Sequence, residues 1–377
     1  RARLTTGEYP EARQFATELL KDYRYRSNAE ALWLFHLAYE ANGDAAEAGQ
    51  MLQAIMQFLN GQRGISDENT LIFIGRALLK AAATDPKQVK ENLFDRVLKS
   101  SPDNREALLV TGELALAKRD FKLAGQTFTR AIGHYPDDAD LLYGLAKAYA
   151  ESDPSQMEEP LHTAMFTNPD HVPSLLLQAH NQADAEQYDT ANGILKAIFK
   201  INPNHAASWA LQAALHTVRN EPDKAKSARA SGLKYWKTNP LVDHEIGKKL
   251  SSKYLFAEGA AHQRQALEFS KDYLQAKTQL AQDLLRLGQE EEGWRLAEEA
   301  HKADGYDVTT YNLLTLHDSL KKYTTIDRNG FLLRMTPDEA ALYGDEAIDL
   351  LTEARELFSA KYDTQIEGPV IVEIFPE

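Results

Sequence analysis

Residues 103–138 decide the fold and read "DNREALLVTGELALAKRDFKLAGQTFTRAIGHYPDD". Residues of contrasting size recur along this stretch, with small ones at Gly112, Ala124 and Ala131 and large ones at Leu108 and Phe128. Small residues let two helices approach closely, and large residues fill the space between the helices. A short turn, "AKRD", interrupts the pattern at residues 117–120. The stretch therefore predicts two antiparallel helices joined by that turn.

The same pattern returns about every 34 residues along the chain. When Arg105 is counted as position 1, further copies begin at Ala139, Val172, Ala206, Pro240, Leu274 and Val308. Less regular copies begin at Ala29 and Glu68, and residues 8–25 have the pattern of a second helix alone. A single helical hairpin cannot bury its own apolar faces, so the copies must stack on their neighbours.

In period and in the placing of small and large residues, these copies resemble the tetratricopeptide repeat (TPR). The resemblance implies an all-α fold, a right-handed α/α superhelix of about eight to nine hairpins over residues 1–321. It also implies a protein or peptide partner, because solenoids of this kind present an extended concave surface. Chaperone-binding members carry a lysine at position 5 with an asparagine at position 9. No copy here has that clamp, which disfavours this partner class.

In proteins of this family, positions 2, 5, 9 and 12 of each first helix line the concave groove. By that rule, the candidate partner-binding residues are Tyr143, Lys147, His180, His244, Lys248 and Gln282. In the copy that starts at Ala206, positions 2, 5 and 9 are all alanine, at Ala207, Ala210 and Ala214. The predicted groove is therefore mixed in character, not uniformly charged.

The pattern stops after Lys321, and residues 322–377 differ in composition. They contain five Lys/Arg and twelve Asp/Glu, a net charge of −7 out of −14 for the whole chain. Asn329-Gly330 between two β-capable runs predicts a hairpin, and Thr336-Pro337 predicts the start of a helix that runs to about Lys361. A strand is expected in "VIVEIF" at 370–375. This small α+β piece is expected to be either a cap on the last repeat or the start of a truncated second domain.

The same segment resembles the opening of a peptidase-MA-like (gluzincin) metalloprotease domain, in "NGFLLRMTPDEAALYGDEAIDLLTEARELFSAKY" followed by "GPVIVEIFP". Such an enzyme needs His-Glu-x-x-His, in which two histidines bind zinc and the glutamate activates water. The nearest sequence is "HEIGK" at 244–248, where Lys248 stands in place of the second histidine. We therefore assign no catalytic residue, metal ligand or cofactor, and a metallopeptidase activity would require a domain beyond residue 377.

The composition narrows the function further. The chain has no cysteine, which excludes disulfides and thiolate metal sites, and its net charge of −14 argues against a nucleic-acid partner. No apolar stretch is long enough for a membrane span. The first residue is Arg1, so an export signal could have been lost; the protein would then belong to the bacterial envelope or be exported, and otherwise it would be cytoplasmic.

Three functional hypotheses follow from these observations. The first is a scaffold that binds a partner protein or peptide through its concave surface. The second is a substrate-recruiting arm of a larger metallopeptidase-like protein whose catalytic part lies beyond residue 377. The third is a structural subunit of a multiprotein assembly, with solenoids stacked on one another.

Overall fold

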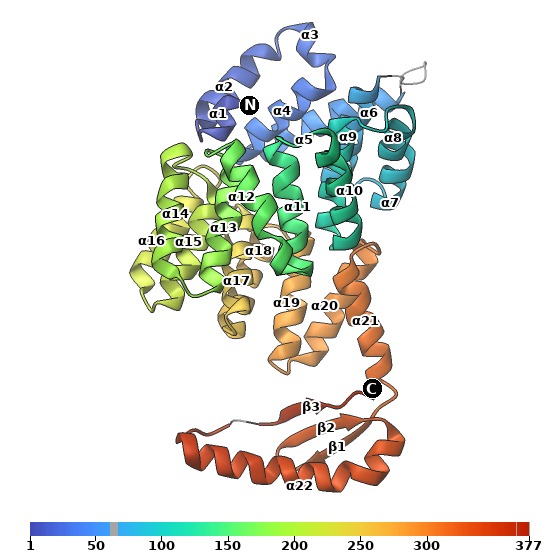
Figure 1. Cartoon of the computed structure of the whole chain (residues 1–377), viewed down its shortest axis with the longest axis vertical. Coiled ribbons are helices and arrows are strands. Elements are labelled where there is room, and N and C mark those ends of the chain that lie inside the picture. The colour runs from blue at the N-terminus through green and yellow to red at the C-terminus, as the bar shows by residue number, and fades with distance from the viewer. Residues whose placement is uncertain (61–66, 367, 377) are drawn as a thin grey trace.

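The computed structural model describes residues 1–60, 67–366 and 368–376. Antiparallel helical hairpins stack in chain order, followed by a small sheet with one long helix (Figure 1). The helices of the stack are α1 (Ala2–Thr5), α2 (Tyr9–Leu19), α3 (Tyr23–Arg26), α4 (Ala29–Ala41), α5 (Ala45–Met56), α6 (Glu68–Lys80), α7 (Pro86–Val89), α8 (Asp95–Ser100), α9 (Arg105–Ala117), α10 (Phe121–His134), α11 (Ala139–Ser152), α12 (Glu158–Thr167), α13 (Val172–Asp184), α14 (Tyr188–Ile201), α15 (Ala206–Val218), α16 (Pro222–Gly232), α17 (Pro240–Ser252), α18 (Phe256–Phe269), α19 (Leu274–Arg286), α20 (Glu290–Ala303) and α21 (Val308–Leu320). Short 3₁₀ turns follow α5 (Gln57–Asn60) and precede α12 (Pro154–Gln156), and a π turn (Lys90–Phe94) joins α7 to α8.

The predicted fold class, an α/α superhelix with a small α+β piece, is confirmed, and its packing follows the size pattern of the sequence. Phe128 of α10 is completely buried between α9 and α11. A Cβ atom on Gly112 would come within 2.4 Å of the Phe128 ring, and one on Gly144 within 2.3 Å. The two glycines therefore make room for the aromatic ring that joins one hairpin to the next.

The turns inside the hairpins repeat with the same period. Glu186, Asn220, Tyr254 and Gly288 each stand between the two helices of a hairpin, 34 residues apart, and each has a positive φ between 57° and 73°. This left-handed conformation suits glycine and is strained for other residue types. Glu186 and Tyr254 therefore hold a conformation that their side chains disfavour, whereas asparagine at Asn220 tolerates it.

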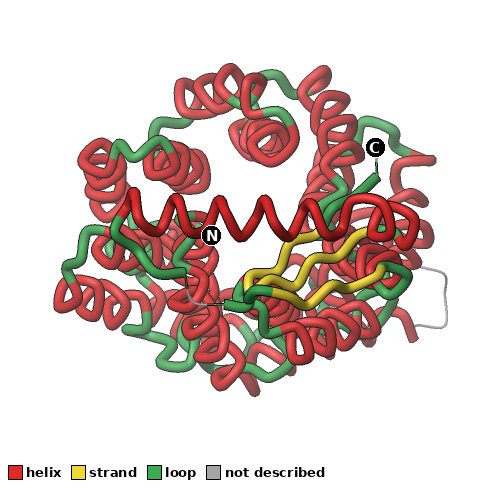
Figure 2. Tube along the Cα trace, turned by 90° about the horizontal axis from the view of Figure 1, so that it is seen from below, coloured by secondary structure: helices red, strands yellow, loops and turns green. Residues whose placement is uncertain are grey.

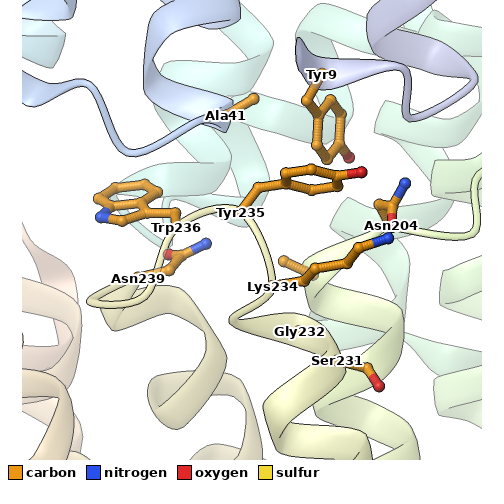
Figure 3. Close-up of a pocket in the computed structure, with 10 residues that line it drawn as sticks. Tyr9, Ala41, Asn204, Ser231, Gly232, Lys234, Tyr235, Trp236 and Asn239 are labelled. Carbon is orange, nitrogen blue, oxygen red and sulfur yellow. Dashed lines mark hydrogen bonds between the residues drawn. The ribbon is translucent and has the colours of Figure 1, made fainter.

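Successive turns of the superhelix touch one another. Between α2 and α15, Asn204 Nδ2 donates to the Gly7 carbonyl at 3.0 Å, and the rings of Tyr9 and Tyr235 meet edge to face with centroids 5.8 Å apart. Figure 3 shows this contact, in which Tyr9 lies against Tyr235. A Cβ atom on Gly43 would lie 2.9 Å from the Trp236 ring. We call this contact of residues 7–43 with residues 202–236 the inter-turn seam.

A second contact between turns lies further along the array. The Lys118 ammonium pairs with Asp304, and the Lys118 carbonyl accepts a hydrogen bond of 3.2 Å from the Val308 N–H. Seen from below, the helices are arranged in a ring, with the strands and the long C-terminal helix in front of it (Figure 2). The array therefore closes on itself after one turn. It has an inner side that faces the middle of the ring and an outer side that faces away from it.

The helices on either side of α15, which are α13 and α17, contact each other directly. Lys249 Nζ of α17 donates to Asp184 Oδ1 of α13 at 2.7 Å, so the first helices of two hairpins that are not neighbours in the chain are bridged. Ala210 and Ala214 of α15 are completely buried. These alanines were expected to line the groove, and that expectation is wrong because their small side chains let α17 pack closely along α15.

The C-terminal segment has the predicted order of elements. A hairpin of β1 (Thr324–Arg328) and β2 (Phe331–Met335) is followed by α22 (Pro337–Tyr362) and by β3 (Val370–Glu373), which pairs with β2 in parallel. Asn329 and Gly330 have φ of 54° and 76°, as a two-residue hairpin turn requires. α22 covers one face of the sheet, with Ile348 completely buried.

This segment contacts the end of the stack through β2. Arg334 pairs with Glu290 of α20 and with Glu373 of β3. β1 and β3 are the outer strands of the sheet, and Leu342, Leu350 and Leu357 of α22 are exposed. Whether residues 322–377 form a cap or part of a second domain stays a prediction. In the described part of the chain, no helix is long and apolar enough to cross a membrane.

Candidate partner-binding surface

Candidate residues from three different helices come together on the inner side of the ring. Tyr143 and Lys147 belong to α11, His180 to α13 and Lys248 to α17. The Lys147 ammonium lies 5.8 Å from the centroid of the Tyr143 ring. Both lysine side chains are exposed. We refer to these four residues with Glu245 of α17 as the inner cluster.

Glu245 lies among the positive groups of the inner cluster. Burial acts to raise the pKa of its carboxyl, but Lys248 and, to a smaller extent, His244, His180 and Lys147 lower it overall. The pKa of Lys147 is raised, first by Tyr143 and then by Glu245, although the two charged residues are 98 positions apart in the chain. The cluster therefore holds two ammonium groups around one carboxylate, with a net charge of +1.

The histidine of the inner cluster is neutral at neutral pH. Burial lowers the pKa of His180 to about 4, with a smaller contribution from the Lys249 ammonium. A neutral imidazole offers one hydrogen-bond donor and one acceptor. His180 is therefore suited to hydrogen bonding with a partner, not to pairing with its charge.

Two of the six predicted residues lie outside this cluster. His244 is only 8% exposed; its Nδ1 bonds Gln263 Oε1 at 2.9 Å and its ring meets Tyr273 edge to face. It packs α17 against α18 instead of lining the groove. Gln282 Nε2 donates to the Thr278 carbonyl of its own helix at 3.4 Å and lies on α19.

The inner side also carries a row of paired charges, which differs from the inner cluster. Arg76 of α6 pairs with Glu106 and Glu113 of α9 at 2.8 and 2.9 Å. Arg105 pairs with Glu106 at 3.1 Å and with Asp140 of α11 at 2.6 Å. These charges join one first helix to the next and are used by the fold itself.

By contrast, the charged groups of the inner cluster make no ion pair with the other described residues. Among the residues described, no ion pair engages Lys147, Glu245 or Lys248. They lie within electrostatic reach of one another, yet each has capacity for a further partner. Such groups are the part of the inner surface that a ligand can use.

The position rule missed three residues that shape this surface. Glu245 stands at position 6, between the groove positions 5 and 9, so the rule did not select it. Asp184 and Lys249 form the bridge across α15, and neither stands at a groove position. No local pattern identifies this bridge, because it joins hairpins 65 residues apart.

No group of three or more His, Asp or Glu side chains that could hold a metal ion is found in the described ranges. The three residues of "HEIGK" with polar side chains also point to different surroundings. His244 is bonded within the packing of α17 and α18, Glu245 lies in the inner cluster and Lys248 is exposed.

No family model matches the sequence, and no curated protein matches it. Among solved structures, the protein is similar to a chain in the crystal structure of the APC/C hetero-tetramer Cut9-Hcn1. The two share 12% sequence identity with a TM-score of 0.51, and the match covers 83% of this chain and 60% of the other. The chain thus spans 60% of that protein's length. A second structure is TTC0263, a thermophilic TPR protein of Thermus thermophilus, with 19% identity and a TM-score of 0.34, over 58% of this chain and 100% of that one. The likeness to the first of these structures is one of fold alone.

Proposed function

We propose that the protein is an interaction scaffold that holds an extended segment of a partner protein on the inner side of its ring, at the inner cluster. The fold supports a role in protein interaction in general, because stacked hairpins offer a long surface. The observation that carries the proposal is the inner cluster itself. Its charges are brought together from α11 and α17, beside the neutral His180 of α13, and are left without ion pairs in the described residues.

The chemistry of the cluster indicates what the segment carries. Two ammonium groups and one carboxylate leave one positive charge in excess, so an acidic side chain of the partner is favoured beside Lys147 and Lys248. Tyr143 supplies an aromatic surface with a polar end, the type of side chain that is enriched in interfaces. An extended segment can contact several first helices at once, so this is the form of partner that we propose.

A peptide library displayed on phage, selected on the immobilised chain, tests this proposal. We expect enriched sequences with Asp or Glu, and we expect Lys147→Glu with Lys248→Glu to weaken their binding at least tenfold, or about 1.4 kcal/mol. The matched control is Lys196→Glu with Lys200→Glu, which makes the same charge change on exposed residues of α14. The proposal is wrong if no acidic sequence is enriched, or if both double variants weaken binding equally.

A further inference from the structure

A cavity of about 340 Å³ lies between the hairpin α15/α16 and the hairpin α17/α18, away from the inner cluster. Its lining combines small apolar side chains with charged ones, among them Ala213, Ala225, Lys226, Arg229, Ile246 and His262. Ala213 and Ile246 are buried, whereas Lys226 is exposed. The cavity therefore has an apolar floor and a charged opening.

The repeat pattern explains why a cavity is present at this step of the stack. Arg229 stands at position 24, which Phe128 occupies in the repeat that starts at Arg105. Asp243 stands at position 4 of the next repeat, where Leu108 and Leu142 stand in two others. Two large apolar residues that would fill the gap between hairpins are thus replaced by an ion pair, and the space is left open.

The ion pair orients the groups that face the cavity. Asp243 is completely buried and accepts two hydrogen bonds from Arg229, from Nε at 2.8 Å and from Nη2 at 2.6 Å. His262 Nδ1 lies 2.7 Å from the same carboxylate. Arg229 Nη1 and His262 Nε2 make no other hydrogen bond within the described residues, and Lys226 makes no ion pair there. Three nitrogen groups are therefore available at the cavity.

The remaining acidic group of the lining is already occupied. Glu221 Oε1 accepts from Lys224 Nζ at 2.9 Å, and Glu221 Oε2 lies 2.6 Å from His216 Nδ1. Because Asp243 balances the charge of Arg229, the positive charge offered to a ligand is that of Lys226, and Arg229 offers a hydrogen-bond donor beside the apolar floor. A volume of this size is at the lower end of the range of about 300–1,000 Å³ that small-molecule sites occupy.

We propose that this cavity is a binding site for a carboxylate attached to a small apolar body, with the carboxylate at Lys226 and Arg229 and the apolar body over Ala213 and Ile246. The site is independent of the inner cluster and of the partner proposed there. Two sources have this chemistry: a free organic acid, and the C-terminal residue of a peptide that ends in an apolar side chain.

Titration calorimetry with three acids tests the site: octanoate, N-acetyl-leucine and an acetylated pentapeptide that ends in leucine. The matched neutral probes are octanol, N-acetyl-leucine amide and the pentapeptide amide. We expect saturable binding of at least one acid and binding at least tenfold weaker for its neutral counterpart. Binding of octanoate or N-acetyl-leucine alone identifies a free acid as the ligand, whereas binding of the pentapeptide alone identifies a peptide terminus.

Variants of α16 place the binding at the cavity. Ala225→Phe fills the space and should abolish binding, whereas Ala230→Phe, on the same helix and outside the lining, should leave it unchanged. Lys226→Ala should weaken binding at least threefold. Arg229 is left intact because its loss would leave a buried carboxylate unpaired. The proposal is overturned if no acid binds saturably, or if Ala225→Phe binds as well as Ala230→Phe with the same melting temperature.

Discussion

Adding one methyl group at Gly144 of α11 should destabilise the stack, although the same change elsewhere in a helix usually stabilises. A Cβ atom at this position would lie 2.3 Å from two atoms of the Phe128 ring, far inside ordinary contact distance. The ring cannot move away, because a Cβ at Gly112 on its other side would be only 2.4 Å from it. Overpacking of a core costs roughly 1–3 kcal/mol.

The helix itself gains from the substitution, so the two effects must be weighed. Replacing glycine by alanine inside a helix gains about 1 kcal/mol of helix propensity. For Gly144→Ala we therefore expect a net loss of up to about 2 kcal/mol. Gly125→Ala in α10 is the matched control, because nothing lies within 4 Å of its added Cβ. That variant should be more stable by about 0.5–1 kcal/mol.

Guanidinium chloride unfolding, followed by circular dichroism at 222 nm, measures both effects. Long repeat arrays are not strictly two-state, so the transition midpoints of the variants are compared with one another. Adding Phe128→Leu to Gly144→Ala should recover part of the loss, with a coupling energy of about 1 kcal/mol or more between the two sites. A midpoint for Gly144→Ala that rises as it does for Gly125→Ala would contradict tight packing of the Phe128 ring.

Three further predictions follow from the turns, the seam and a buried histidine. Glu186→Gly should stabilise the chain by about 1 kcal/mol, because glycine adopts positive φ without strain, and Gly288→Ala should cost about as much in the same unfolding assay. Tyr235→Ala removes an aromatic pair worth about 0.5–1.5 kcal/mol from the inter-turn seam, and should increase the radius of gyration in small-angle X-ray scattering; an unchanged radius would contradict the role of the seam. Burial lowers the pKa of His205 to about 4 from 6.5, so the unfolded chain binds the proton more readily and stability should fall as the pH falls from 6.5 to 4. His205→Asn should reduce that slope of midpoint against pH, and an unchanged slope would contradict the prediction.

The elements of this fold were predictable from the sequence because their causes are local. The size pattern around Phe128 determines where each helix packs, and Asn329-Gly330 determines where the hairpin turns. The start of α22 was predicted for the right residues, but Thr336 does not make the side-chain hydrogen bond to the backbone that a threonine at this position usually makes. Thr336 Oγ1 donates instead to Glu339 Oε2 at 2.7 Å.

The candidate surface was only partly predictable because it depends on curvature. The position rule selected Lys147 and Lys248, which do lie together, but it gave no reason for them to meet across the two hairpins that separate α11 from α17. Their meeting depends on small rotations between hairpins that accumulate along the array. The same rule selected His244, which is buried and bonds Gln263 of α18, a contact between two helices that the position of a residue within one repeat does not reveal.

The inter-turn seam also bears on how an array of this kind can change during evolution. Open solenoids tolerate the duplication or loss of a whole unit, because each unit contacts only the next. Here Gly7 meets Asn204, 197 positions later, and Tyr9 meets Tyr235, 226 positions later. One additional hairpin between them would bring a different loop opposite Tyr9, so the number of units within this interval is fixed by the need to match both sides of the contact.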